Sequence, residues 1–372
     1  MPANNFNSKK KFVYYAPLVN LKQDAAFRPY IEIPMEMKNH GFESYLICGK
    51  LNLKPPDGIN IIETGIVSEK RFDIFRVYRF TKNFLHNYKP DIFIYFHLNL
   101  IIIPLILFSR IYHLKTKYLV KLDSDGSDFK KTNNINNILK RLYIVFLSYY
   151  VSGIIIENTC GLQILRDIKF INKSKLLLLP NSFSSRQYKI KKYQDELRKN
   201  YILFVGRIHP EKNLSLLIDA FVGATKSYKG WQLHLVGPID DENYFKKLTN
   251  DYKCYILNNK ILFCGPLFGK QLLLEYLHAS IFCLPSINES FGIARLEAMA
   301  NGIPVITSEA GCGMEFKNFG SLIFYHDDRV KLEYYIKALI CSELKRIEIS
   351  EKQSKNLITY SIIIQKLLDF LE

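Results

Sequence analysis

Residues 285–306 of this chain read PSINESFGIARLEAMANGIPVI. An apolar run of strand length, 281–284, precedes them, residues 292–300 favour a helix, and a second apolar run lies at 304–307. The order strand, helix, strand is that of a βαβ unit, whose two strands lie parallel in one sheet. This stretch therefore predicts an α/β fold built on a parallel sheet.

The same alternation extends through the rest of the chain. A length of 372 residues exceeds one ordinary hydrophobic core, and a polar segment separates two series of apolar runs. We predict an α/β protein of two Rossmann-like domains whose parallel sheets face a cleft, with a first domain over 1–184, a linker over 185–199, a second domain over 200–350 and a C-terminal amphipathic helix over 351–372. The expected strands are 11–16, 44–48, 91–96, 117–122, 153–156, 175–179, 201–205, 232–236, 261–264, 281–284 and 304–307, and the main expected helices are 29–40, 71–88, 138–150, 214–221, 270–278 and 292–300.

Composition excludes several classes of protein. With 48% hydrophobic and 23% charged residues, the chain is not a disordered or low-complexity sequence. Its seven cysteines contain no Cys-x-x-Cys pair, so neither a disulfide framework nor a zinc knuckle is indicated, and we expect a cytoplasmic setting. The apolar stretch 92–108 is interrupted by polar residues and is too short for a membrane span, and residues 1–12 lack the apolar core of a secretory signal.

The segment after residue 284 carries groups suited to a phosphorylated sugar ligand. Glu289 lies in the loop, and Gly292 opens a helix whose free N–H groups and positive dipole end attract phosphate oxygens. Glu297 lies about a turn and a half into that helix, where its carboxylate is able to accept hydrogen bonds from the vicinal hydroxyls of a ribose. The alternative is that each glutamate only has a favourable electrostatic position near the helix start, worth about 0.3–1 kcal/mol.

A second cationic segment follows the strand 201–205. It reads Gly206-Arg207-Ile-His-Pro-Glu-Lys212. The glycine allows the backbone to turn beneath a ligand, and two cations five positions apart are able to reach one pyrophosphate. Solvated cations at strand ends are equally common, so this segment alone leaves both interpretations open.

Taken together, these motifs resemble a known family. Gly206-Arg207-x4-Lys212, Leu235-Val-Gly237-Pro238, Phe263-Cys-Gly265 and Glu289-x7-Glu297, followed by Ala298-Met-Ala-Asn-Gly302-x-Pro304, resemble the retaining glycosyltransferases of family 4, which have the GT-B fold. The order and spacing agree over residues 201–324.

The resemblance implies an activity and a site. Arg207 and Lys212 would hold the leaving nucleotide diphosphate, Glu289 would contact the hydroxyls of the donor sugar, and Glu297 would bind the ribose. The sequence offers no evident nucleophile, so we expect a metal-independent, cofactor-free, same-face transfer in which the leaving phosphate accepts the acceptor's proton. The remaining residues of the implied donor site are Gly206, Gly265, Ser290, Phe291 and Gly292.

The first half of the chain offers weaker candidates for the acceptor side. Asp123-Ser-Asp125 follows the strand 117–122 and matches the metal-binding Asp-x-Asp of another glycosyltransferase fold, but three-letter acidic matches arise by chance and we expect no metal here. Asp123 is a candidate for orienting the acceptor, and an Asx turn is an equal alternative. We interpret His97, which also ends a strand, as a buried histidine first and as an acceptor-side residue second.

Charge is concentrated in the first half. Residues 1–190 carry a formal net charge of +14 and residues 191–372 only +2. We expect an anionic partner for that half, with Arg71, Arg76, Arg79 and Lys82 on an aromatic-rich helix, whereas the apolar helix 138–150 should be packed inside the domain. No nucleic-acid-binding signature is present. The expected protein is a glycosyltransferase at the inner face of the membrane that transfers a sugar to a lipid-linked glycan; the alternatives are a soluble sugar or sugar-phosphate transferase and a catalytically silent membrane-binding protein.

Overall fold

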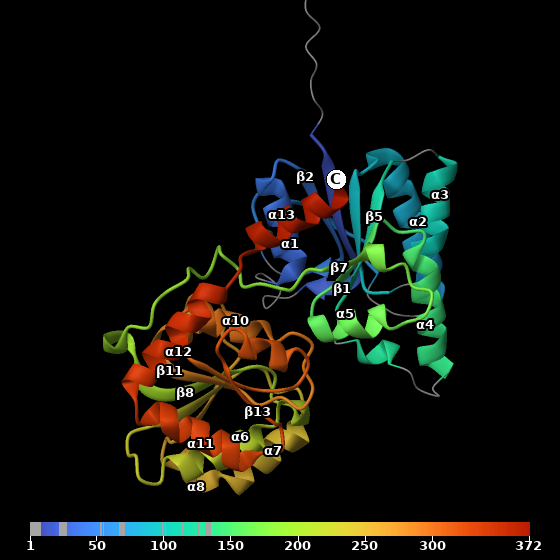
Figure 1. The fold of residues 1–372 in the computed structure, drawn as a ribbon. Coiled ribbons are helices and arrows are strands. Elements are labelled where there is room, and N and C mark those ends of the chain that lie inside the picture. Colours follow the sequence, from blue (N-terminus) through green and yellow to red (C-terminus); the bar gives the residue numbers. More distant parts are fainter. Residues whose placement is uncertain are drawn as a thin grey trace, which may run out of the picture. The chain divides into compact units, whose positions relative to one another are not determined.

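The computed structural model describes residues 9–21, 28–52, 54, 56–66, 71–98, 100, 102–112, 115–124, 126–130 and 135–372, without the side chains of residues 71–74 and 127. The described chain forms two compact units (Figure 1). The first consists of residues up to Asn181 together with Tyr360–Glu372, and the second of Ser182–Thr359.

The first unit contains a parallel sheet of seven strands in the order β3-β2-β1-β4-β5-β6-β7. Its order reverses between β1 and β4, which pair directly through Tyr15 and Tyr95. A reversal of this kind is where ligands bind in open α/β sheets, beyond the carboxyl ends of the strands. The strands are β1 (Lys11–Leu21), β2 (Glu43–Leu51), β3 (Asn60–Glu63), β4 (Ile92–Phe96), β5 (Lys117–Leu122), β6 (Gly153–Ile156) and β7 (Leu176–Leu178).

Helices cover this sheet because the connections between parallel strands must cross it. The strands β4 and β6 are buried along their whole length, as expected for a sheet covered on both faces. The helices of the first unit are α1 (Pro29–Asn39), α2 (Arg71–Tyr88), α3 (Ile102–Ile111), α4 (Ile135–Ser148), α5 (Thr159–Arg166) and α13 (Tyr360–Leu371).

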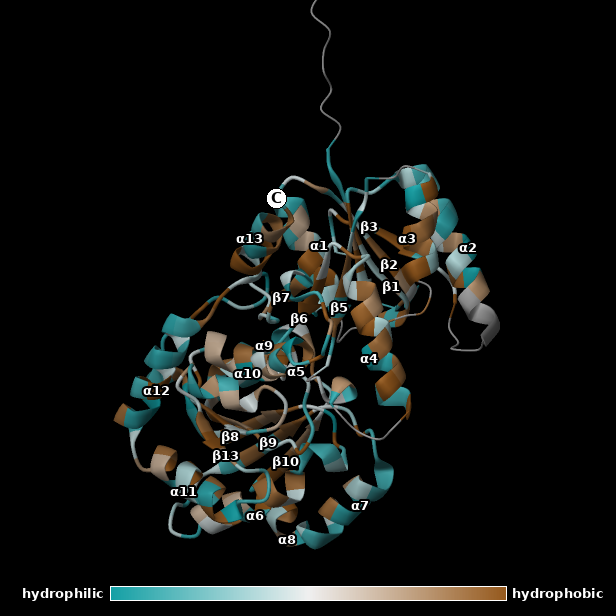
Figure 2. Ribbon diagram, turned by 45° about the vertical axis from the view of Figure 1, so that its right-hand side comes forward, coloured by the Kyte–Doolittle hydropathy of each residue, from teal (hydrophilic) through white to brown (hydrophobic). Residues whose placement is uncertain are grey.

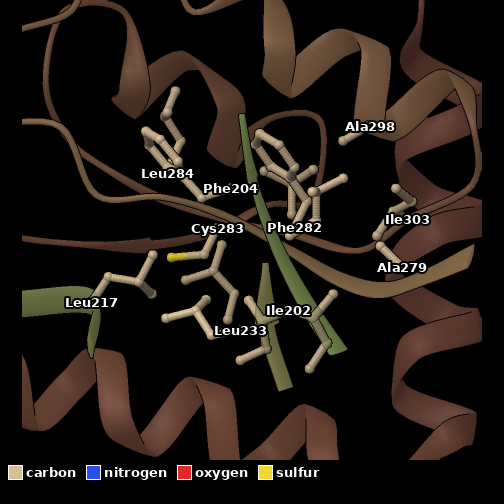
Figure 3. Close-up of a cluster of buried hydrophobic side chains, with 14 of the residues drawn as sticks. Ile202, Phe204, Leu217, Leu233, Ala279, Phe282, Cys283, Leu284, Ala298 and Ile303 are labelled. Atoms are coloured by element: carbon tan, nitrogen blue, oxygen red, sulfur yellow. The ribbon is translucent and has the colours of Figure 1, made fainter. Parts of the chain in front are cut away.

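The second unit contains a parallel sheet of six strands in the order β10-β9-β8-β11-β12-β13. Apolar side chains of β8, β9 and β11 form the centre of its core, with Ile202, Phe204, Leu233 and Phe282 among them (Figure 3). The two parallel Rossmann-like domains predicted from the sequence are therefore confirmed. The strands are β8 (Lys199–Val205), β9 (Gln232–Val236), β10 (Ile261–Gly265), β11 (Ala279–Leu284), β12 (Val305–Ser308) and β13 (Leu322–Phe324).

The helices of the second unit follow the expected crossovers. Leu217 of α6 and Ala298 of α10 pack into the core shown in Figure 3. The helices are α6 (Leu214–Ala224), α7 (Glu242–Asp251), α8 (Lys253–Leu257), α9 (Gly269–His278), α10 (Ile293–Ala300), α11 (Arg329–Ile340) and α12 (Glu343–Asn356), with short 3₁₀ turns η5 (Pro210–Lys212) and η6 (Gly313–Lys317) near the loops of the site.

The structure differs from the predicted boundaries at both ends of the second unit. The predicted linker 185–199 lies inside the second unit, where the Lys191 N–H donates to the Ala300 carbonyl and Arg198 donates to several carbonyls of residues 276–301. The predicted single helix 351–372 is instead the end of α12 and all of α13, separated at residues 357–359. The apolar face of α13, with Ile363, Ile364 and Leu367 buried, packs on the first unit and not on the domain that precedes it in sequence.

Two further expectations about the first unit are wrong. Strand β1 extends to Leu21 instead of ending at residue 16, because Asn20 and Leu21 resume the pairing with β2 after an irregularity. Helix α4 is not packed on nearly all sides. Only Ile144, Leu147 and Ser148 are buried on it, because α4 lies on the sheet with one flank and the described elements leave the opposite flank open.

Candidate active site

The site in the second unit is formed by two loops at the sheet's reversal point. Strands β8 and β11 are hydrogen-bonded neighbours, so the loops that follow Val205 and Leu284 leave the sheet at the same edge. The Ile287 N–H donates to the Glu211 carbonyl at 2.7 Å, which joins the two loops directly. The predicted cationic and acidic segments are thereby brought together, at the position where parallel sheets bind ligands.

Lys212 and Glu289 form the centre of this arrangement. The Lys212 Nζ lies 2.8 Å from Glu289 Oε2, and both side chains are nearly buried, at 11% and 13% exposure. The Ser286 hydroxyl donates to the same carboxylate oxygen at 3.3 Å. Burial by itself would raise the pKa of Glu289, but the charges of Lys212 and Arg295 outweigh that effect and hold the pKa below its usual value. Glu289 is therefore an ionised carboxylate at neutral pH.

Helix α10 starts directly beside this carboxylate. Gly292, its N-cap, has φ of 71°, a conformation that favours glycine, and the helix runs from Ile293. The preceding loop is packed against a second glycine: a Cβ on Gly311 would lie 1.9 Å from the Glu289 carbonyl oxygen. These two glycines hold the N–H groups at the start of α10 next to Glu289, which provides the anion-binding end of a helix.

Arg207 has different surroundings from Lys212. Its guanidinium is half exposed, forms an ion pair with Asp240 and lies 3.8 Å from Glu211 Oε2. The two predicted cations thus flank the loop from opposite environments, one buried and one open to solvent. Each is paired with a carboxylate, and an incoming diphosphate would have to compete with those carboxylates.

Glu297 is more deeply placed than the sequence suggested. Its side chain is 9% exposed, and the Tyr276 hydroxyl of α9 donates to Glu297 Oε2 at 2.8 Å. Tyr276 itself is fully buried. The hydrogen bond fixes the carboxylate's orientation between α9 and α10, and a ribose hydroxyl would have to approach the oxygen atoms from the remaining open side.

The other predicted donor residues lie on the loops of the same unit. Gly206 follows β8, and Gly265 ends β10, where its carbonyl accepts from the Gly237 N–H at 2.9 Å. Ser290 is exposed, whereas Phe291 is buried against Phe316, with ring centroids 5.9 Å apart. Phe291 therefore supports the loop from below, while Ser290 offers a hydroxyl to solvent.

The first unit has a pocket of its own beyond the ends of β4 and β5. It has a volume of about 580 Å³ and brings the two acceptor-side candidates, His97 and Asp123, together. Its opposite wall belongs to α4, through Leu139, Lys140 and Tyr143. The pocket thus combines a polar edge at the strand ends with an apolar wall.

His97 corrects one expectation. It is exposed, with φ of 67°, so the interpretation as a buried histidine is wrong. Partial loss of water around the ring lowers the pKa of His97, and the nearby Asp123 carboxylate offsets only part of this effect. The imidazole is therefore mainly neutral at pH 7, with a nitrogen able to accept a proton.

The acidic turn after β5 is described only in part. Asp125 lies outside the described residues; of the turn around it, the structure shows that the Ser124 hydroxyl accepts from the Gly126 N–H at 3.1 Å. This bond closes a turn at Ser124; an Asx turn at Asp123 would use the N–H of Asp125, which lies outside the described residues. Over the part of the chain that the structure describes, no group of three His, Cys, Asp or Glu side chains is arranged to hold a metal ion.

Three features escaped the sequence analysis. Arg295 lies fully buried in α10, and Tyr276 contacts Glu297. Lys121 and Glu157 form a buried ion pair at the ends of β5 and β6. A charged residue within an apolar stretch, as at Arg295 and Lys121, is the signal in the sequence that pointed to two of these features.

The open flank of α4 is apolar. We call its exposed side chains the α4 stripe; Figure 2 shows much of this helix in the brown of hydrophobic residues. Arg110 of α3 lies over the Tyr150 ring at 5.1 Å, which places a cation beside the end of the stripe. Among the described helices none is long and apolar enough to cross a bilayer. The α4 stripe consists of Ile135, Ile138, Leu139, Leu142, Phe146 and Tyr149.

Comparison with known proteins agrees with this geometry. Residues 185–355 match the family model of the glycosyl transferases group 1. This segment contains both loops of the site and stops short of the first unit, so the match covers slightly less than half of the chain.

Curated proteins similar to part of this chain include two mannosyltransferases. The phosphatidyl-myo-inositol mannosyltransferase of Mycobacterium leprae is 34% identical over 110 residues, which are 29% of this chain and 28% of that protein. The O-antigen chain mannosyltransferase RfbU of Salmonella typhimurium is 28% identical over 169 residues, 45% of each chain. The matches thus span less than half the length of these relatives.

Solved structures resemble the whole chain. A glycosyltransferase from Rickettsia africae has a TM-score of 0.75 at 17% identity, with 98% of both chains covered. WaaG, a glycosyltransferase involved in lipopolysaccharide biosynthesis, has a TM-score of 0.68 at 14% identity, with 97% of this chain and 99% of that chain covered. At these identities the similarity establishes the fold, the pair of Rossmann-like domains found in GT-B glycosyltransferases.

Proposed function

We propose that the protein is a retaining glycosyltransferase that moves a sugar from a nucleotide diphosphate donor to a hydroxyl of a lipid-linked glycan. The donor binds to the second unit and the acceptor to the first. The observation that carries the proposal is the contact between Lys212 and Glu289 beside the start of α10. A cation, a carboxylate and free helix N–H groups meet there, and these are the groups that a sugar diphosphate requires.

The proposed chemistry follows from the charges at this site. Negative charge develops on the departing phosphate oxygen, and fixed cations and helix N–H groups aimed at that oxygen stabilise it in the transition state. Lys212 and Arg207 supply the cations, and ionised Glu289 accepts hydrogen bonds from the sugar hydroxyls. The leaving phosphate accepts the acceptor's proton on the same face of the sugar, so the reaction runs without a metal or other cofactor.

The first unit supports a lipid-linked acceptor. Its pocket joins His97 and Asp123 to a wall of α4, and the α4 stripe continues outward from that wall as exposed apolar surface. A net charge of +14 over residues 1–190 attracts anionic headgroups, at about 1 kcal/mol for each cation near the surface. We therefore place the protein at the cytoplasmic surface of the membrane, with α4 in the headgroup layer.

The proposal is tested first by ligand-induced thermal stabilisation with UDP, GDP, ADP and CMP. A ligand present at 100 times its Kd adds about 2.7 kcal/mol to the stability of the folded state, which is a readily measured shift in Tm. One nucleoside diphosphate should stabilise the wild type, and Arg207→Ala/Lys212→Ala should lose the shift. Lys246→Ala/Lys247→Ala on α7 is the matched control. No shift with any of the four nucleotides, or an unchanged shift in the Arg207/Lys212 variant, would refute the donor site.

A further inference from the structure

Arg295 is the largest fully buried side chain in the described residues, with an exposure of 0%. It lies one turn into α10, and a Cβ on Gly292 would come within 2.8 Å of its Nε. The guanidinium therefore packs beneath the turn that starts the helix. A charged group in such a position needs a compensating partner, because removing a charge from water costs several kcal/mol.

The hydrogen bonds of Arg295 leave that requirement unmet. Nη2 donates to the Ala310 carbonyl at 3.3 Å, and the guanidinium lies 5.0 Å from the centre of the Phe316 ring. Nε and Nη1 are buried and have no hydrogen-bond partner. Two donors of a buried cation are thus unpaired, next to the Gly292 turn that ends the loop carrying Glu289.

The charged and titratable groups around Glu289 come from three elements. Lys212 of η5 forms the direct ion pair, Arg295 of α10 acts from behind the loop, and Cys312 lies beyond β12. Burial raises the pKa of the Cys312 thiol to about 12, so it contributes no charge at neutral pH. Glu289 therefore has two cationic neighbours, one in contact and one behind it.

The two cations have different freedom. In the proposed function, Lys212 must turn from Glu289 to the donor's diphosphate. Glu289 would then be a nearly buried carboxylate without its ion-pair partner, and such a group takes up a proton. A protonated carboxyl would accept hydrogen bonds from the sugar less well than a carboxylate does.

We propose that Arg295 is a positioning residue that keeps Glu289 ionised when Lys212 leaves it to bind the donor's diphosphate. This inference rests on the proposed function for the movement of Lys212, but not for the pairing of Arg295 with Glu289. Because α10 and the tight Gly292 turn hold the guanidinium in place, Arg295 is unable to follow the phosphate. Lys212 thus stabilises the leaving phosphate, and Arg295 keeps the Glu289 carboxylate charged.

The pairing is tested without any ligand, by urea denaturation from pH 5 to pH 8. The variants are Lys212→Met, Arg295→Met and the double Lys212→Met/Arg295→Met, each compared with the same variant carrying Glu289→Gln. In Lys212→Met, Arg295 keeps the Glu289 pKa low, so its stability relative to the Gln counterpart stays level over this range. In the double variant burial raises that pKa above the unfolded value, so the folded state binds the extra proton and stability rises as the pH falls. The folding equilibrium constant should then rise by up to tenfold per pH unit relative to the Gln counterpart.

Each result decides the pairing. If Lys212→Met alone shows the same pH response as the double variant, or if the double variant shows none, Arg295 does not hold the charge of Glu289. Arg295→Met replaces a buried charge by an apolar side chain of similar length and should fold. If the double variant fails to fold, Lys212→Met/Arg295→Lys takes its place and should behave like Lys212→Met, because it restores the cation.

The catalytic consequence is tested with UDP, GDP, UDP-glucose and GDP-mannose by calorimetry at pH 6 and pH 8. Arg295→Met should bind the bare nucleotide with an affinity within about twofold of the wild type. At pH 6 the sugar should increase its affinity roughly tenfold less than it does in the wild type, which is the effect of one charged hydrogen bond. At pH 8 most of that loss should return, and Arg295→Lys should restore it at both pH values. Equal losses for nucleotide and nucleotide sugar, unaffected by pH, would make Arg295 a purely structural residue. If the wild type binds none of the four compounds and gives no thermal shift with ADP or CMP either, the proposed function fails, and the ligand-free measurements still decide the pairing.

Discussion

The ammonium group of Lys212 lies 2.8 Å from the carboxylate of Glu289, although 77 positions separate the two residues in the chain. The contact exists because β8 and β11 are neighbours in the sheet and each strand ends in a loop of the same edge. Both side chains are nearly buried, so each depends on the other for compensation of its charge. The predictions below start from this contact and move outward.

Glu289→Gln should slow sugar transfer by about 10²- to 10³-fold while the protein still unfolds cooperatively. The substitution removes the negative charge that is assigned to the sugar hydroxyls, and losses of this size are typical when one preorganised electrostatic group is removed. Release of nucleoside diphosphate from a sugar derivative of the nucleotide that stabilises the protein in the thermal panel measures the rate. Glu242→Gln, an exposed glutamate at the start of α7, is the control, and turnover near the wild-type level in Glu289→Gln would contradict the assignment.

Glu297 should determine the preference for ribose over deoxyribose. The wild type should bind UDP or GDP roughly tenfold more tightly than the 2′-deoxy form, and Glu297→Gln should reduce this ratio, because a neutral amide accepts from the hydroxyl less strongly than a carboxylate. Tyr276→Phe removes the hydrogen bond at 2.8 Å and should lower the free energy of unfolding by about 1–3 kcal/mol without abolishing the ribose preference. If Glu297→Gln weakens both forms equally, the ribose contact lies elsewhere.

Metal removal should have little effect. The proposed stabilising charges belong to the protein, so excess EDTA should leave the rate within about twofold of the untreated enzyme. The transfer rate of Asp123→Asn should likewise not depend on added Mn²⁺. Loss of the rate on chelation and its recovery with Mn²⁺ would show that the acidic turn after β5 binds a metal in the working enzyme.

Membrane binding should depend on both charge and the α4 stripe. The full-length protein should sediment with vesicles that contain anionic phospholipid, and binding should weaken between 0.1 and 1 M salt as the Debye length falls from about 10 to about 3 Å. Residual binding at high salt should disappear in Leu142→Ser/Phe146→Ser, because those side chains are exposed on the stripe. Val330→Ser/Leu344→Ser, on side chains of the second unit that are more exposed than Leu142 and Phe146, is the control.

The aromatic side chains of α2 give a narrower test of membrane insertion. Phe75 is 76% exposed and is free to enter the headgroup layer, whereas Phe80 packs against the core of the first unit. The side chain of Phe72 lies outside the described residues. Phe75→Ser should therefore weaken vesicle binding at high salt less than Leu142→Ser/Phe146→Ser does. If neither variant weakens binding, the exposed apolar side chains of α2 and α4 do not insert into the membrane.

Local sequence patterns were sufficient for most of the fold. Apolar runs of four to six residues predicted all the described strands except the short edge strands β3 and β13, and the glycines and polar residues that follow them predicted the loops of the site. These features depend on short stretches of chain, because side-chain periodicity and backbone preference act over a few residues. Glu289, Lys212 and Gly292 were found this way, since each belongs to a loop that immediately follows or precedes an apolar element.

Burial and pairing required the tertiary structure. The sequence assigned Arg207 and Lys212 the same role. In the structure Arg207 is half exposed and paired with Asp240, whereas Lys212 is nearly buried and paired with Glu289. It predicted that helix 138–150 would be buried, and the structure leaves its apolar flank open because the sheet covers only one side. The last helix belongs to the first unit because α13 packs against α1 there. Each outcome depends on which distant segment packs against a residue, and that information lies in contacts between elements and in no local stretch of the chain.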